Sequence, residues 1–380
     1  MQVSRRSALA LFATAFGGAA FGVSACRSAP STTQAALPEN ALITLGVQAG
    51  PPPVPNKIGI SSALKIGDDV YQIDCGLGSL NDASKGAVES NDNAGLKFDQ
   101  LRTMFITHLH TDHTVDYGSF LFSGGYTASK GKAPVTVYGP GAAGGLPPSQ
   151  VGNPDPATID PAHPTPGLAE MTKSLQQAFA YTNNIFIRDM GTDDLQTLFT
   201  VTEIAVPPEA NYQNRSPTTD PFPVMSDDNV TVTATLVSHY DVYPAFGLRF
   251  DLKKSGVSVT FSGDTTKSDN LITLAKDTDI LVHEAQFSLD DAYYGDRFPP
   301  NYLKSSHTSA VQVGEVAAAA NAKHVILSHY SPTDLPDSEW TDEIGKNFSS
   351  EVTVARGGQV FTLRGTPEVA HRRVESRSRS

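Results

Sequence analysis

The chain has 380 residues, a formal net charge of −12 and 39% hydrophobic residues. This length and hydrophobic content allow a substantial buried core, in one large domain or in two. The negative charge argues against a general affinity for nucleic acid or for an anionic membrane. The two cysteines, Cys26 and Cys75, are too few for a disulfide framework, and we expect no disulfide.

Residues 1–26 have the pattern of an export signal with a lipobox. Two arginines precede an apolar stretch, residues 8–23, which is short and interrupted by glycine for a membrane span. The segment ends in Val-Ser-Ala-Cys26, similar to the site at which bacterial lipoproteins are cleaved and lipidated. An ordinary signal cleaved after Ala25 is the alternative. We expect an exported lipoprotein of the periplasm or cell envelope, anchored at Cys26 through a flexible tether, residues 27–40.

The first half of the remaining chain shows short apolar runs separated by glycine and proline. These runs predict strands at 41–46, 58–65, 70–74, 101–106 and 135–138. A helix is expected to begin within 117–122. The composition changes at about residue 144.

Residues 144–228 form an irregular and acidic stretch, rich in proline, glycine, asparagine and aspartate. It contains one expected helix, at 168–181. Such a long stretch inside a compact domain is usually a lid or a binding element. We therefore interpret it as an insertion within a single domain, residues 41–365, followed by a disordered tail, residues 366–380.

Regular structure returns after the insertion. Strands are expected at 230–238, 246–251, 257–262, 279–283 and 324–328, and a helix at 308–322. Many expected strands of both halves end in histidine or aspartate: Asp74, His108, His239, Asp264, His283 and His329. Strand ends meet along one edge of a sheet, where an active site can be assembled from distant residues.

The densest group of metal-binding residue types is Thr-His108-Leu-His110-Thr-Asp112-His113. It follows directly on an apolar strand, so His108 and His110 point the same way and can bind one ion. Asp112 and His113 follow where the chain turns, and they can face a second ion. Imidazole and carboxylate suit Zn²⁺, with Mn or Fe as alternatives. Asp74 either orients one of these histidines or begins a turn.

The order of these motifs resembles the metallo-β-lactamase fold superfamily. The motifs on which this resemblance rests are, in chain order, His-Leu-His-Thr-Asp-His, His239, Ser-Gly-Asp264-Thr and Leu-Ser-His329-Tyr-Ser. Two further motifs are similar to the tRNase Z and arylsulfatase-like branch, because His-Glu284-Ala-Gln resembles its HEAT box and His307-Thr-Ser its HST box. The resemblance implies an α/β fold, a four-layer αββα sandwich, with two zinc ions.

The resemblance also assigns roles. His108, His110, His239 and Asp264 would bind one zinc, and Asp112, His113, His329 and a bridging Asp264 would bind the other. Asp112 would orient or deprotonate the attacking water. His307, held by Glu284, would act as general acid or stabilise the leaving oxygen.

The expected function is an exported dinuclear zinc hydrolase that cleaves a phosphodiester or sulfate ester of a small molecule by a metal-bound hydroxide. A lactonase or amide hydrolase and a tRNase Z-like phosphodiesterase are alternatives, and a non-enzymatic, lipid-tethered binding protein is a third. The acidic insertion argues against nucleic acid, because phosphate contacts dominate affinity for it. A homodimer is left open.

Overall fold

The computed structural model describes residues 37–80, 96–129, 131–149, 152, 157–295 and 298–364. The predicted export signal, Cys26, nearly all of the tether and the predicted tail lie outside the described residues. Within the described ranges, no helix has the length and apolar character needed to cross a membrane.

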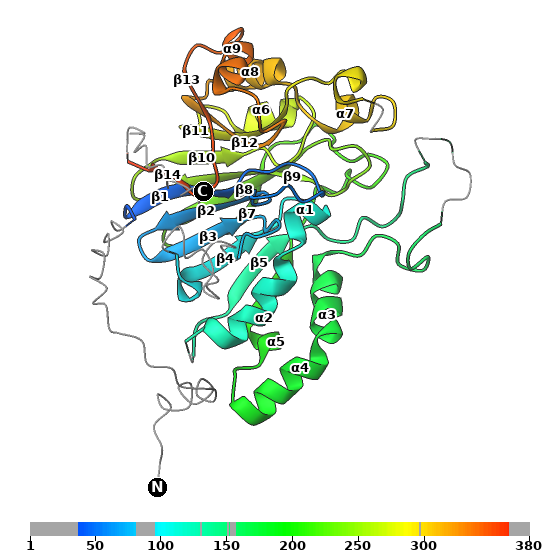
Figure 1. Cartoon of the computed structure of the whole chain (residues 1–380), viewed down its shortest axis with the longest axis vertical. Helices are drawn as coiled ribbons and strands as arrows, with labels where there is room; N and C mark the ends of the chain where they lie inside the picture. The colour runs from blue at the N-terminus through cyan, green and yellow to red at the C-terminus, as the bar shows by residue number, and fades with distance from the viewer. Residues whose placement is uncertain are drawn as a thin grey trace, which may run out of the picture. The chain divides into compact units, whose positions relative to one another are not determined.

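Two seven-stranded sheets form the centre of the structure (Figure 1). The first contains, in spatial order, β14 (Gln359–Thr362), β1 (Asn40–Gly46), β2 (Ser61–Ile66), β3 (Asp69–Ile73), β4 (Leu101–Phe105), β5 (Val135–Gly139) and β6 (Phe199–Glu203). The second contains β13 (Glu351–Val354), β12 (His324–Ser331), β11 (Ile280–Gln286), β10 (Ser258–Phe261), β9 (Phe246–Leu252), β8 (Val230–Leu236) and β7 (Phe222–Ser226).

Both sheets are mixed. Strands β3 to β6 run parallel in the first sheet, and β10 to β13 run parallel in the second. The other neighbouring strands pair antiparallel. Parallel strands need crossover connections, and here these connections consist of helices and of long loops that follow the carboxyl ends of the strands.

Helices cover the outer face of each sheet (Figure 1). On the first sheet lie α2 (Tyr117–Thr127), α3 (Leu168–Ala178) and α5 (Leu195–Leu198), and on the second lie α6 (Asp269–Leu274), α8 (Ala310–Ala319) and α9 (Asp337–Gly345). Helix α3 continues into α4 (Ala180–Ile185) and a π-helical turn, Phe186–Met190. The short helices α1 (Thr111–Thr114) and α7 (Tyr302–Ser306) sit in loops. The arrangement is the predicted αββα sandwich.

Alternation along the strands explains the layers. Met104 of β4 packs in the cluster beneath α2, whereas its neighbour Phe105 belongs to the cluster between the sheets. The rings of Phe105 and Phe250 meet edge to face with centroids 5.0 Å apart, which joins β4 of one sheet to β9 of the other. This shared core fixes the two sheets against each other.

Residues 144–228, expected to be an irregular insertion, contribute an edge strand to each sheet. β6 pairs parallel to β5, and β7 pairs antiparallel to β8. Both strands have only five residues. Three residues of β6 are exposed, none of β7 is fully buried, and β7 contains Pro223, so their sequences lack a strong apolar alternation. The expected helix at 168–181 is observed as α3 with the start of α4.

Candidate metal centre

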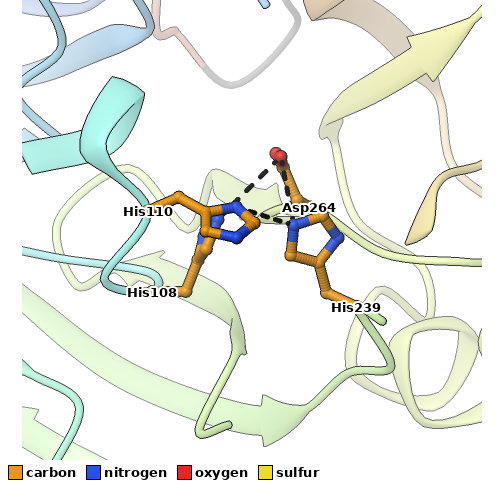
Figure 2. Close-up of side chains that lie close together, drawn as sticks. All are labelled: His108, His110, His239 and Asp264. Atoms are coloured by element: carbon orange, nitrogen blue, oxygen red, sulfur yellow. Dashed lines mark hydrogen bonds and ion pairs between the residues drawn. The ribbon is translucent and has the colours of Figure 1, made fainter. Parts of the chain in front are cut away.

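The seven residues predicted as metal ligands lie together in two groups. The first group is His108, His110, His239 and Asp264, and the second is Asp112, His113 and His329. Within each group, one ligand atom of every residue lies within 4.8 Å of the others. Figure 2 shows the first group, in which His108 and His110 from one loop converge with His239 and Asp264 from two others. This is the division between two ions that the sequence resemblance implied.

Asp264 lies between the two groups. Its Oδ2 is 3.8 Å from Nε2 of His239 and 4.0 Å from Nε2 of His108. The same oxygen is 3.4 Å from Nε2 of His113 and 3.3 Å from Nε2 of His329. One carboxylate oxygen is therefore within reach of both groups, as a bridging ligand must be.

The ligands come from both sheets. Those between His108 and His113 follow β4 of the first sheet, whereas His239, Asp264 and His329 lie at the ends of β8, β10 and β12 of the second sheet. His329 has φ of +57°, a left-handed conformation that turns its side chain out of the strand direction. The expectation that strand ends gather into one site is confirmed for these residues.

The turn after β3 holds the short helix α1 in place. The backbone N–H of Cys75 donates to the carbonyl of His113 at 2.8 Å, and that of Asp116 donates to Cys75 at 3.1 Å. A Cβ at Gly76 would lie 2.4 Å from the carbonyl oxygen of Asp112, closer than real Cβ contacts allow. Only glycine lets the turn approach the two ligands of α1 this closely.

Hydrogen bonds to Nδ1 orient two of the imidazoles. Nδ1 of His113 is 2.8 Å from Oδ2 of Asp74, and Nδ1 of His239 is 2.7 Å from the carbonyl of Ser306. Asp74 also accepts from the backbone N–H and the hydroxyl of Thr107. Of its two interpretations, the structure therefore supports Asp74 as the partner of a histidine. Sequence reasoning missed Thr107 and Ser306, whose only signal is their position beside His108 and His307.

Most ligands have pKa shifts that fit a cation site. The exception is His113, where burial opposes protonation but the carboxylates of Asp264 and Asp74 raise the pKa, so a bound cation would displace a proton there. Burial lowers the pKa of His239 to about 3 and holds the pKa of His108 well below its usual value, so both imidazoles are neutral. Burial opposes ionisation of Asp112 and Asp264, but neighbouring imidazoles outweigh it, and both carboxyl pKa values are lowered. Neutral imidazoles and ionised carboxylates are the forms that bind metal.

Several buried ligand atoms have no hydrogen-bond partner among the described residues. They are Nε2 of His108, Nε2 of His113, Oδ1 of Asp112 and Oδ1 of Asp264. A buried polar atom without a partner is costly, and the cost is larger for a charged group. Two divalent cations held by these residues would satisfy all four atoms, so the donor set fits a dinuclear site.

Glu284 ties together two loops beside the ligands. Its Oε1 lies 3.3 Å from Nδ1 of His307 and accepts from the backbone N–H groups of Thr308 and Thr265 at 3.0 and 3.3 Å. Burial alone would lower the pKa of His307, but the carboxylate of Glu284 outweighs it, and the pKa is raised. The ring of His307 lies 5.1 Å from that of His239. An imidazole with a raised pKa thus lies beside the first group of ligands.

Comparison with known proteins agrees with this geometry. Residues 165–330 match the model of the beta-lactamase superfamily domain. The chain is 27% identical to ribonuclease Z of Mycolicibacterium gilvum over 315 residues, covering 82% of this chain and 92% of the relative, and 27% identical to ribonuclease Z of Mycobacterium bovis over 318 residues, covering 82% and 94%.

Solved structures agree with the fold. The metallo-beta-lactamase fold protein YhfI from Bacillus subtilis has a TM-score of 0.56 at 18% identity, covering 84% of this chain and 98% of that protein. The short form of human tRNase Z has a TM-score of 0.55 at 19% identity, with the same coverage of both chains. With its αββα layers and its motifs in order, this chain is similar to the beta-lactamase superfamily domain over residues 165–330 and to ribonuclease Z enzymes over most of its length.

Proposed function

We propose that this metal-dependent hydrolase is a dinuclear phosphodiesterase, with an RNA phosphodiester as its substrate. The observation that carries the proposal is Asp264, whose Oδ2 lies between two groups of ligands, next to the His307–Glu284 pair. The similarity to ribonuclease Z enzymes supports a phosphodiester over a sulfate ester, a lactone or an amide. This replaces the small-molecule ester as the first candidate.

The protein groups have separate tasks in this proposal. Two divalent cations, when bound, would polarise the ester and lower the pKa of the attacking water. Asp112, whose Oδ2 accepts from the backbone N–H of Gly50 at 3.0 Å, would orient or deprotonate that water. His307 would donate a proton to the leaving oxygen, and Glu284 would keep its imidazole oriented and protonated.

A small phosphodiester is the second candidate, and charge favours it. The chain carries a net charge of −12. Two of the basic residues within 144–228 are ion-paired, Arg188 with Asp189 and Arg215 with Asp241. Paired guanidinium groups contribute little to the binding of a long polyanion.

The test compares three substrates with the purified chain loaded with zinc. They are an RNA with a 3′ extension, bis-p-nitrophenyl phosphate and p-nitrophenyl sulfate, and His110→Ala serves as the blank. Hydrolysis of the RNA and of the phosphodiester, with the sulfate ester unchanged, is the expected result. Cleavage of the small phosphodiester alone would favour the second candidate, a small phosphodiester, as the substrate. Turnover of neither phosphodiester with two zinc ions bound would overturn the proposal.

Export and lipidation at Cys26 belong to the proposal as well, on the strength of the signal pattern at residues 1–26. Growth with labelled palmitate tests the anchor, since Cys26→Ser should abolish labelling that the natural chain shows. Equal labelling of both chains, or labelling of neither, would rule the anchor out.

A further inference from the structure

A series of aromatic rings leads from the metal centre to the surface. His307 contacts Tyr302, with ring centroids 6.3 Å apart. Tyr302 stacks on Phe298, with ring centroids 5.3 Å apart and ring planes at an angle of 10°. Tyr240 also contacts Tyr302, with centroids 4.9 Å apart. We refer to Tyr240, Tyr302 and Phe298 as the aromatic wall.

The wall is both close to the ligands and open to solvent. Tyr302 is half-buried, and its ring lies 6.3 Å from that of His307, which in turn lies 5.1 Å from the ring of the ligand His239. At the other end, Phe298 is 39% exposed. Tyr240, like Tyr302, is half-buried. An exposed apolar ring that continues into partly buried rings beside a polar site suits the binding of a planar ligand.

The backbone around the wall is held firmly. The N–H of Tyr240 donates to the carbonyl of Ser305 at 2.8 Å, which joins the loop after β8 to α7. Leu303 of α7 is buried, and the N–H of His307 donates to its carbonyl at 2.9 Å. Because the same short helix carries Tyr302 and leads into His307, a ligand on the wall would be positioned relative to the proton donor.

We propose that the aromatic wall is a stacking subsite for a planar ring, a nucleobase or an aryl group, carried by the leaving group of the phosphodiester. The proposal rests on the proposed function, because it takes the oxygen beside His307 as the leaving oxygen. A ring is recognised by its flat face, which every base and aryl group has, and stacking therefore requires no particular sequence. Stacking also needs no cationic side chain, which suits an acidic protein.

The test measures binding of phosphate monoesters that carry the ring on the ester oxygen, as the leaving group of the substrate does, and needs no turnover. Adenosine monophosphate, phenyl phosphate and methyl phosphate are titrated calorimetrically into the zinc-loaded chain, into Phe298→Leu and into Tyr302→Leu. Phe179→Leu is the matched control, because Phe179 is 45% exposed but lies where α3 meets α4, on the other helical layer (Figure 1). Tyr302→Phe keeps the ring and should bind as the natural chain does.

We expect Phe298→Leu and Tyr302→Leu to bind the ring-bearing phosphates about tenfold more weakly. Methyl phosphate should bind equally to all variants. A loss with adenosine monophosphate identifies a base as the occupant, and a loss with phenyl phosphate alone identifies an aryl group. Equal weakening of all three phosphates, or no change in any, would overturn the subsite. A chain that binds these probes through the wall but hydrolyses no phosphodiester would refute only the proposed function.

Discussion

Asp74 and His113, 39 residues apart in the chain, form a buried hydrogen bond of 2.8 Å between Oδ2 and Nδ1. The bond fixes the direction in which Nε2 of His113 points, and it links the end of β3 to the helix α1. A group that orients a metal-bound histidine typically increases metal affinity by a factor of about 10 to 100. We expect Asp74→Asn to weaken binding of the second zinc by about this factor.

Metal titration with a chromophoric chelator measures this effect. Asp69→Asn is the matched control, because Asp69 begins the same strand and pairs with the half-exposed Arg102 at 2.7 Å. Equal zinc affinities of Asp74→Asn and the natural chain would show that Asp74 has no part in orienting His113.

Replacement of His307 separates proton donation from metal binding. We expect His307→Gln to lower kcat by a factor of about 10² to 10⁴ with both metal ions retained, because a general acid contributes about that much. The loss should be larger for a nucleoside leaving group than for p-nitrophenolate, which leaves without a proton. His324→Gln is the control, since His324 begins β12 and bonds to Thr353 at 2.8 Å. A similar loss for both leaving groups would contradict the assignment.

Gly76 should not accept a side chain. In Gly76→Ala, the Cβ would meet the carbonyl oxygen of Asp112 at 2.4 Å and the backbone of Gly59 and Ile60 at 2.7 Å. We expect a loss of about 1–3 kcal/mol in unfolding free energy, together with weaker metal binding as α1 is displaced. Gly345→Ala, at a position with open space in α9, should retain the stability of the natural chain. Urea unfolding of both variants decides the point.

Asp279 should make stability depend on pH. Burial opposes its ionisation, but Lys323 at 2.6 Å and Ser258 at 2.8 Å outweigh it, so its pKa is lowered in the folded chain. A lowered folded pKa stabilises the protein above the unfolded value of about 3.9, and the contribution disappears as pH falls through the folded pKa.

We therefore expect Asp279→Asn to reduce stability by about 1 kcal/mol at neutral pH, a modest value because the Lys323 side chain is 63% exposed. The difference between the two chains should shrink below about pH 4. Urea unfolding of both chains at several pH values tests this, and a difference independent of pH would exclude the ion pair as its cause.

Removal of metal should destabilise the fold. A chelator would remove the free energy with which the cations bind the folded chain at Asp112, Asp264 and the imidazoles, so the melting temperature should fall by several degrees and recover on addition of zinc. Thermal unfolding with and without chelator measures this, with Asp264→Asn expected to respond less than the natural chain. A melting temperature that the chelator leaves unchanged would argue against a buried dinuclear site.

Much of the site could be predicted from sequence because its residues are local or carry strong chemistry. The ligands between His108 and His113 lie in one motif, and His239, Asp264 and His329 follow apolar strands that are easy to identify. Thr107, Ser306 and the aromatic wall could not be found, because their roles depend on which loops meet in space. Tyr240 and Phe298 lie far apart in the chain and give no periodic signal.

The central strands of the fold could be predicted because their sequences carry a strong local signal, whereas the edge strands could not. Buried central strands such as β4 and β11 contain apolar runs, Met104-Phe105 and Ile280–Val282, whereas the edge strands β6 and β7 are short and mostly outside the core. Edge strands are defined by the neighbour with which they pair rather than by their own composition. The interruption by Pro223 adds to the ambiguity.

Because the two sheets each supply part of one ligand set, bound metal reports on their alignment. A substitution in the core between the sheets, for example at Phe105 or Phe250, would shift one set of ligands against the other. Even a slight displacement of one sheet relative to the other would change the metal affinity while the chain is still folded. In any variant of this protein that leaves the metal site itself unchanged, a change in zinc affinity would therefore indicate that the two sheets have moved relative to each other.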